Sequence, residues 1–290
     1  MGWQSLGFDS CVVVSPKSAV LVLVHSNVFI ALSATSVAVT TTLLAGFPLA
    51  VGPLFIVFAA TLFVYNLNRI TDMSEDATNV PGRVEFVRAY GRIWLAVGML
   101  LYLLATGLAV TRDLPRAEFI VVPLLVGLLY SLRVKRILLL KNLLVGASWG
   151  LIPLGIGTYF GRVWTADVLF LAVYVCIMIT LAAIVFDIKD IEGDRAAGIR
   201  TVPVVSDPRT TRVLTQAGNV LVGAGVIGLV AAGVLGVEYL VLLAFHLYVG
   251  AYIPFAVPER TLLFYGFVVD GEHVFLAALI TLMEAFPCPL

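Results

Sequence analysis

Charged residues are scarce in this chain. Asp, Glu, Lys and Arg make up 12% of its 290 residues, whereas hydrophobic residues make up 61%. A water-soluble domain has roughly 25% charged and about 45–50% apolar residues, so the composition excludes a soluble globular protein. The formal net charge is zero, which excludes the general basic field that favours nucleic acid. We therefore expect no nucleic-acid partner.

Cysteine and histidine are also rare. The chain has three of each, namely Cys11, Cys176, Cys288, His25, His246 and His273. The cysteines are odd in number and far apart, which excludes a disulfide framework, and neither residue type has the spacing of a metal site. No positive charge precedes Lys17. The N-terminus therefore does not resemble a cleaved signal peptide, and we expect the first helix to remain in the mature chain.

Long apolar runs fill most of the sequence. A helix needs about 20 residues to cross the roughly 30 Å hydrocarbon core of a membrane, and these runs lack the alternation of barrel strands. They predict transmembrane helices at 19–43, 47–70, 91–111, 117–133, 139–160, 166–188, 212–236, 238–256 and 271–286. The last run carries Glu284 and ends at Pro287, so eight helices are an alternative to nine. We expect an all-α polytopic membrane protein, a single domain over residues 1–290.

Basic residues are concentrated on one side of this predicted protein. With the N-terminus in the cytoplasm, fifteen of the eighteen Lys and Arg residues fall in cytoplasmic segments. The exceptions are Arg112, Arg116 and Arg162. Because Lys and Arg favour cytoplasmic loops, we expect the loops after the second, fourth and sixth helices to lie in the cytoplasm.

Acidic residues form two groups on the same side. The group after the second helix consists of Asn68, Asp72 and Asp76, with one amide and two carboxylates four residues apart. The group after the sixth helix consists of Asp187, Asp190 and Asp194. Spacings of three and four place side chains on one face of a helix. Each group is therefore predicted to form a polar stripe at a helix end.

Two such stripes in one bundle indicate a cation between them. Like charges at this spacing repel each other by roughly 0.2–0.5 kcal/mol per pair when no counter-ion is present. Carboxylate oxygen suits Mg²⁺, whose coordination is commonly completed by phosphate oxygens of a substrate. The pattern predicts a Mg²⁺ site that holds a diphosphate at the cytoplasmic end of the bundle.

Other functions fit parts of this pattern. Charged residues just beyond a membrane helix are often solvated anchors, and the basic residues around Lys135 serve equally well to set the topology. A secondary transporter also has many helices, although transporters place their ions near the midplane, whereas these charges lie at one face. A phosphatase or phosphotransferase acting on a polyprenyl phosphate would use Mg²⁺ and aspartates as well.

The two acidic groups resemble the aspartate-rich motifs of the UbiA superfamily of intramembrane prenyltransferases, such as 4-hydroxybenzoate polyprenyltransferase. The second group is followed by a Gly193–Pro203 segment similar to the family's usual continuation, and Tyr130–Asn142 is similar to its Tyr/Lys segment. Arg69 stands where the family commonly has Asp, which replaces one metal ligand with a cation. The resemblance covers nearly the whole chain. It implies nine helices around a central cavity, capped in the cytoplasm by the 2–3 and 6–7 loops.

The resemblance also implies an activity and a site. The reaction would be Mg²⁺-dependent transfer of an isoprenyl group from a prenyl diphosphate, such as geranyl or geranylgeranyl diphosphate, to a lipophilic or aromatic acceptor, with loss of diphosphate. The catalytic residues would be Asp72, Asp76, Asp190 and Asp194. Two Mg²⁺ ions would be bound by these four residues together with Asn68 and Asp187. The diphosphate would be bound by Arg69, Arg83, Tyr130 and Lys135. The allylic cation would be shielded by Phe63, Tyr65, Trp149 and Phe186. The prenyl tail would lie in the apolar bundle with access from membrane lipid, and no residue selects the acceptor.

Overall fold

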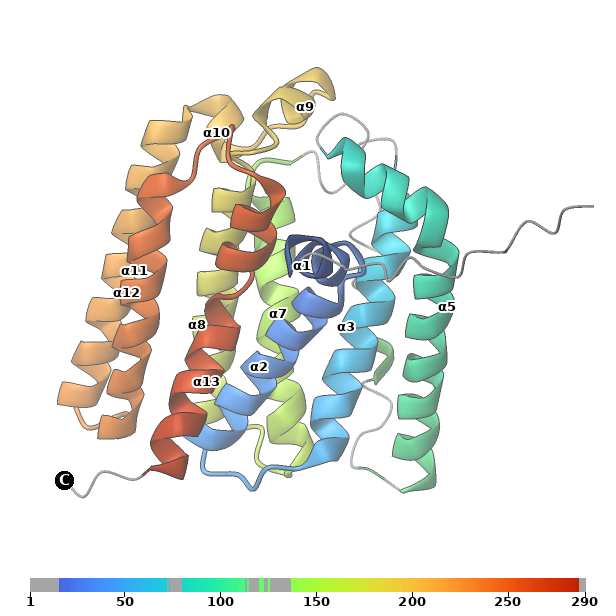
Figure 1. The fold of residues 1–290 in the computed structure, drawn as a ribbon. Coiled ribbons are helices and arrows are strands. Elements are labelled where there is room, and N and C mark those ends of the chain that lie inside the picture. Colours follow the sequence, from blue (N-terminus) through green and yellow to red (C-terminus); the bar gives the residue numbers. More distant parts are fainter. Residues whose placement is uncertain are drawn as a thin grey trace, which may run out of the picture.

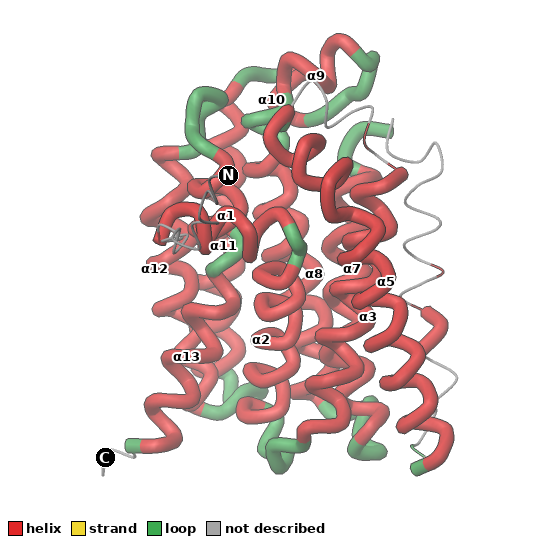
Figure 2. Tube along the Cα trace, turned by 45° about the vertical axis from the view of Figure 1, so that its right-hand side comes forward, coloured by secondary structure: helices red, strands yellow, loops and turns green. Residues whose placement is uncertain are grey.

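The structure is a computed structural model that describes residues 16–71, 73, 80–112, 114, 120–122, 125 and 137–286. Within these ranges the regular structure is entirely helical, as Figure 2 shows. The elements are α1 (Pro16–His25), α2 (Val28–Leu44), α3 (Val51–Thr71), α5 (Pro81–Thr111), α7 (Leu140–Tyr159), α8 (Ala166–Phe186), α9 (Ile191–Ala196), α10 (Val202–Val205), α11 (Pro208–Ala231), η3 (Val237–Val241), α12 (Leu242–Tyr252), η4 (Ile253–Phe255), η5 (Phe264–Val269) and α13 (Glu272–Ala285).

The long helices stand side by side as a bundle, with α9 and α10 together at one end (Figure 1). Seven helices of the described chain are long and apolar enough to cross a membrane, or eight if α1 and α2 count as one bent span. The protein is therefore an integral membrane protein. Most of the predicted 117–133 helix lies outside the described residues, so the total of nine stays a prediction.

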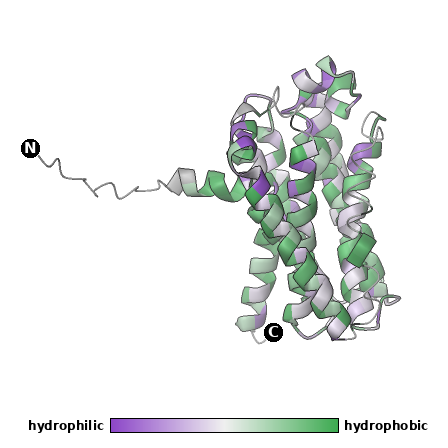
Figure 3. Cartoon of the chain, turned by 90° about the vertical axis from the view of Figure 1, so that its right-hand side faces the viewer, coloured by the Kyte–Doolittle hydropathy of each residue, from purple (hydrophilic) through white to green (hydrophobic). Residues whose placement is uncertain are grey.

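Hydrophilic residues gather at the end of the bundle that carries α9 and α10, as Figure 3 shows. The shafts of the helices between the two ends are mainly hydrophobic. This distribution of hydrophilic residues is expected of a helix bundle whose middle lies in lipid and which carries most of its charge at one end.

The first predicted span, 19–43, is wrong as one continuous helix. It breaks at Ser26–Asn27, where the axes of α1 and α2 differ by 71°, and α1 leaves the bundle sideways (Figure 3). Asn27 adopts the left-handed conformation, with φ of 62°, which Asn tolerates better than most residues. Its side chain donates a hydrogen bond to Asn66 Oδ1 of α3, at 3.1 Å. This contact with a distant helix stabilises the break.

Several predicted helix ends also differ, for local reasons. The 91–111 helix begins ten residues earlier, at Pro81, because proline suits the first helical turn. The 212–236 helix begins at Pro208, where Asp207 caps it by accepting hydrogen bonds from the backbone of Arg209 and Thr210. It ends at Ala231, before Gly233 with φ of 69°. The N-terminal ends of both helices thus extend beyond the apolar runs.

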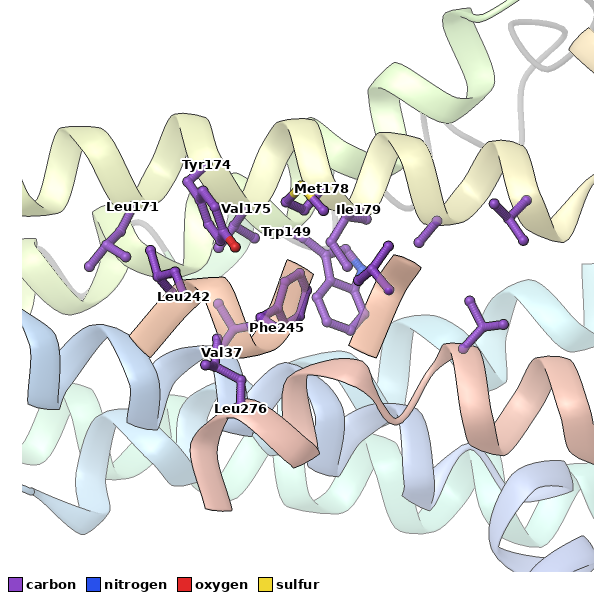
Figure 4. Packing of buried hydrophobic residues seen from close by; sticks show 14 of the residues in the cluster. Val37, Trp149, Leu171, Tyr174, Val175, Met178, Ile179, Leu242, Phe245 and Leu276 are labelled. Carbon is purple, nitrogen blue, oxygen red and sulfur yellow. The ribbon is translucent and has the colours of Figure 1, made fainter. Parts of the chain in front are cut away.

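The main core lies where α8 meets α2, α7, α12 and α13. Its buried side chains include Tyr174 and Met178 of α8, Trp149 of α7 and Phe245 of α12, which Figure 4 shows packed together. A buried aromatic and aliphatic cluster of this kind holds the helices at fixed positions. The candidate site is lined in part by the same residues.

Close packing of α7 against α8 depends on Gly146. A Cβ atom there would overlap Thr180 Oγ1 and the backbone carbonyl oxygen of Cys176. Because backbone cannot move aside without separating the helices, we expect Gly146→Ala to lower the free energy of unfolding by about 1–3 kcal/mol. Thermal unfolding in detergent would measure this. Gly155→Ala is the control on the same helix, since nothing lies within 4 Å of a Cβ there, and its melting temperature should be unchanged or slightly raised.

Candidate active site

A cavity of about 250 Å³ opens among α2, α3, α5, α7, α8 and the segment from η5 to α13. Charged residues line one part of it, including Arg69, Arg83, Lys141 and the three aspartates of the 187–194 segment. Apolar and aromatic residues such as Ile179 and Trp149 line another part. The cavity therefore joins a charged region to the apolar interior of the bundle.

The second acidic group lies across a helix break. Asp187 follows the last residue of α8, Asp190 precedes the first residue of α9, and Asp194 lies within α9. The expected helix over 166–188 therefore ends at Phe186, and the group is not one face of a continuous helix. All three side chains nevertheless line the cavity. The three aspartates are therefore brought together by the turn between α8 and α9, and not only by their spacing along a helix.

Lys141 of α7 binds two of these aspartates. Its Nζ lies 2.8 Å from Asp187 Oδ1 and 3.5 Å from Asp194 Oδ2. The neighbouring Asn142 donates a hydrogen bond to Asp187 Oδ2 at 2.9 Å. The start of α7 thus places a cation and an amide donor against the acidic segment, and both oxygens of Asp187 have partners.

Asp190 is bound differently. Its Oδ2 pairs with Lys189 Nζ at 2.5 Å, while its Oδ1 is buried and has no hydrogen-bond partner among the described residues. A buried carboxylate oxygen without a partner costs roughly 1–3 kcal/mol or more. Asp190 therefore has one oxygen available for a ligand within the cavity.

Burial shifts the ionisation of the acidic segment. It raises the pKa of Asp187 from its usual value to about 6, against the opposing effect of Lys141. It also raises the pKa of Asp194 and lowers the pKa of Lys189. Burial disfavours the charged form of each of these groups, whereas the Lys141 ammonium favours the ionised form of Asp187 and Asp194.

Two arginines from other helices line the same cavity. Arg69 comes from the last turn of α3 and Arg83 from the first turn of α5. Both were predicted to bind diphosphate, and the structure places them in one cavity with the second acidic group. The other predicted residues of this end, Asp72, Asp76, Tyr130 and Lys135, lie outside the described residues. Asn68 does not line the cavity, but its Oδ1 is buried without a partner in the described chain.

Three of the four predicted shielding aromatics line the cavity. They are Tyr65, Trp149 and Phe186, and Trp149 Nε1 donates a hydrogen bond to the Tyr65 hydroxyl at 3.1 Å. Phe63 does not belong with them. It stacks on Tyr102 of α5 with ring centroids 5.3 Å apart, because two residues along a helix correspond to a rotation of roughly 200°.

A comparison with protein-family models identifies the family of this chain. The model of the UbiA prenyltransferase family matches residues 27–259, a range that contains both acidic groups and all the predicted site residues. This chain belongs to the UbiA prenyltransferase family. It is therefore an enzyme that transfers prenyl groups, which favours catalysis over the transporter alternative.

Solved structures agree with the fold of the UbiA family. The apo structure of a UbiA homolog from Aeropyrum pernix K1 is similar with a TM-score of 0.66 and 18% identity, over 88% of this chain and 98% of that chain. A digeranylgeranylglyceryl phosphate synthase is similar with a TM-score of 0.56 and 17% identity, over 94% and 100% of the two chains. Among curated proteins, no sequence matches significantly. Identities this low show the shared fold alone.

Sequence reasoning missed several residues of this UbiA cavity. Lys141 and Asn142 belong to the segment that resembles the family's Tyr/Lys segment, but no sequence pattern indicates their contacts with Asp187. Lys189 is one of the fifteen basic residues that the topology alone explains. Glu272 and His273, at the start of α13, also line the cavity. The sequence signal for the last two was an acid and a histidine side by side in an apolar run.

The described residues do not form a metal site by themselves. No group of three His, Cys, Asp or Glu side chains in the described ranges is arranged to hold an ion. The donors do suit Mg²⁺, because they are carboxylate oxygens, one of which lacks a partner on Asp190. Lys141 and Lys189 neutralise the acidic segment in this structure, at oxygens that a divalent cation would also bind.

Proposed function

We propose that this enzyme transfers an isoprenyl group from a Mg²⁺-bound prenyl diphosphate to a lipophilic acceptor. One observation carries the proposal: the three aspartates of the 187–194 segment, together with Arg69 and Arg83, line a cavity that continues into the apolar core. A prenyl diphosphate has the matching form, with a multiply charged head and an apolar tail. Family membership supports prenyl transfer.

The acidic segment would hold the metal. Oxygen ligands for two ions would come from both acidic groups. These are Asp187, Asp190 and Asp194 of the second group and Asn68, Asp72 and Asp76 of the first. When bound, Mg²⁺ would neutralise the diphosphate and stabilise the negative charge that develops on it. The arginines would donate charge-assisted hydrogen bonds to the same oxygens, with Tyr130 and Lys135 as further donors.

The chemical step breaks the allylic C–O bond of the donor. The electron pair leaves with the diphosphate, where Arg69 and Arg83 would stabilise it. The positive charge left on the allylic carbons would face the aromatic rings of Tyr65, Trp149 and Phe186. A nucleophilic atom of the acceptor then forms the new bond to the allylic carbon, and the acceptor loses a proton.

We further propose that the charged end of the bundle faces the cytoplasm. Hydrophilic residues gather at the end of the bundle with α9 and α10 (Figure 3), and fifteen of the eighteen Lys and Arg residues fall in the segments predicted to be cytoplasmic. The bias of these residues toward cytoplasmic segments supports this orientation. The donor would then arrive from the cytoplasm with its tail directed into the membrane.

Donor binding is tested by thermal unfolding with a non-hydrolysable prenyl diphosphate. Because a ligand that binds only the folded state stabilises it, we expect the melting temperature to rise when Mg²⁺ and the analogue are both present. A rise of the same size in EDTA would show that Lys and Arg bind the diphosphate without a metal, and would overturn the metal assignment.

Product analysis then separates prenyl transfer from the phosphatase alternative. The enzyme is incubated with radiolabelled geranylgeranyl diphosphate, a donor chosen because one structural relative is named as a digeranylgeranylglyceryl phosphate synthase. Label in a new lipid, accompanied by free diphosphate, supports the proposal. Release of inorganic phosphate without a labelled lipid product supports a phosphatase instead.

A further inference from the structure

Two buried polar side chains of the cavity have no part in diphosphate binding. Glu272 and His273 begin α13 and are 2% and 1% exposed, and both line the cavity. Glu272 Oε1 and His273 Nε2 have no hydrogen-bond partner among the described residues. Because buried polar atoms are almost always hydrogen-bonded, these two atoms indicate a polar ligand.

The surrounding residues hold both side chains in place. Tyr252 of α12 donates a hydrogen bond to Glu272 Oε2 at 2.7 Å, which leaves only Oε1 for a ligand. The His273 ring packs on Phe245, with centroids 4.9 Å apart, and on Trp149, at 6.0 Å. Trp149 and Phe245, both labelled in Figure 4, belong to the same buried cluster. The two polar side chains are therefore packed against the buried hydrophobic core.

The spacing of the two unpartnered atoms restricts the chemistry of the ligand. They are 3.7 Å apart, which is too far for a direct hydrogen bond. A hydroxyl oxygen between them would donate its hydrogen to Glu272 Oε1 and accept one from His273 Nε2. A hydrocarbon could form neither bond, and a carbonyl could only accept.

We propose that Glu272 and His273 bind the hydroxyl group of the acceptor, so that the acceptor is a hydroxyl-bearing lipid and the product is its prenyl ether. This inference rests on the proposed function. The hydroxyl oxygen forms the new C–O bond to the allylic carbon of the donor, and the bond from that carbon to the diphosphate breaks. The hydroxyl proton passes to Glu272, and His273 positions the oxygen.

The position of the site relative to the donor is consistent with this step. Trp149 contacts His273 with one part of its ring system and hydrogen-bonds Tyr65 with its Nε1. Tyr65 and Trp149 are the aromatics proposed to face the allylic cation. The hydroxyl would therefore lie beside the aromatic rings that are proposed to face the allylic carbon.

Glu272→Gln tests the proton transfer. Glutamine keeps the shape of the side chain and accepts the Tyr252 hydrogen bond but cannot take the proton. With geranylgeranyl diphosphate and a lipid extract of the membranes in which the chain is naturally made, we expect product formation to fall by about 100-fold or more. The Mg²⁺-dependent thermal shift with the donor analogue should stay unchanged.

Glu284→Gln is the control, because Glu284 lies on the same helix and is exposed. Equal activity of the two variants would overturn the proposal.

A second arm uses the wild-type enzyme and so does not depend on how the variants fold. Half of the lipid extract is acetylated to block its hydroxyl groups, and we expect it to give no product. Mass spectrometry should show the product from untreated extract to be an ether, and fragmentation tells an alkyl ether from an aryl ether. Prenylation of acetylated lipid, or a new bond to carbon, would overturn the inference alone. A wild-type enzyme that does not bind the donor would overturn the proposed function and this inference with it.

His273→Phe tests the positioning role separately. Phenylalanine keeps the ring contacts with Phe245 and Trp149 but removes the nitrogen atoms. We expect the KM for the acceptor to rise by more than kcat falls, because the hydroxyl loses a binding partner while Glu272 remains. A loss of kcat with an unchanged KM would overturn this role of His273.

Discussion

Replacement of Asp190 by Asn is expected to lower kcat/KM by roughly 10²–10³-fold. Asn preserves the size of the side chain but removes the negative charge, and its amide cannot replace both carboxylate oxygens as metal ligands. The buried Oδ1 of Asp190 has no hydrogen-bond partner among the described residues, so it can take a ligand without first displacing a lysine. Prenyl transfer by purified enzyme, measured at several Mg²⁺ concentrations, checks the effect.

Glu192→Gln is the matched control for this substitution. Glu192 lies between Asp190 and Asp194 in the sequence, on α9, but its side chain is exposed and does not line the cavity. Its loss of charge should leave kcat/KM within about twofold, since exposed charges interact weakly across solvent. If Asp190→Asn is as active as Glu192→Gln, Asp190 is not a metal ligand.

Most of the membrane spans could be predicted from the sequence, because an apolar run of sufficient length has few alternatives in lipid. The break at Ser26–Asn27 could not. Its stabilising contact joins Asn27 to Asn66, which lies 39 positions further along the chain on another helix, and no local pattern indicates that pairing. Ser26 and Asn27 are a polar pair within an apolar run, but the partner of Asn27 is set by the tertiary structure.

Only part of the candidate site could be predicted, because its other contacts also join residues that are far apart in the sequence. The spacing of Asp187, Asp190 and Asp194 identified a group of carboxylates that does line one cavity, although a turn between two helices brings them together. The Lys141 contact with Asp194 spans 53 positions and lies beyond any local pattern. The error at Phe63 was avoidable, because helical phase alone separates it from Tyr65.

Lys141 is expected to have a large effect on stability, and the effect should depend on the metal. Its ammonium group lies between two buried carboxylates, those of Asp187 and Asp194. Removing one partner of a buried ion pair typically costs about 3–5 kcal/mol, because an uncompensated charge is left behind. We expect Lys141→Met to lower the free energy of unfolding by an amount of this order in EDTA.

Mg²⁺ should restore much of the stability that Lys141→Met loses. A divalent cation at the same carboxylates would supply the missing positive charge, and binding to the folded state alone raises the melting temperature. The difference in melting temperature between Mg²⁺ and EDTA should therefore be larger for Lys141→Met than for the wild-type enzyme. Thermal unfolding in detergent under both conditions measures that difference.

The double variant Lys141→Met, Asp187→Asn separates charge from packing. If the loss of stability comes from the unpaired carboxylate, neutralising Asp187 should make the double variant more stable than Lys141→Met alone in EDTA, and less responsive to Mg²⁺. If the loss comes from packing of the lysine side chain, the second substitution should recover nothing. A Lys141→Met enzyme as stable as wild type in EDTA would show that Lys141 is not the counter-ion of these aspartates.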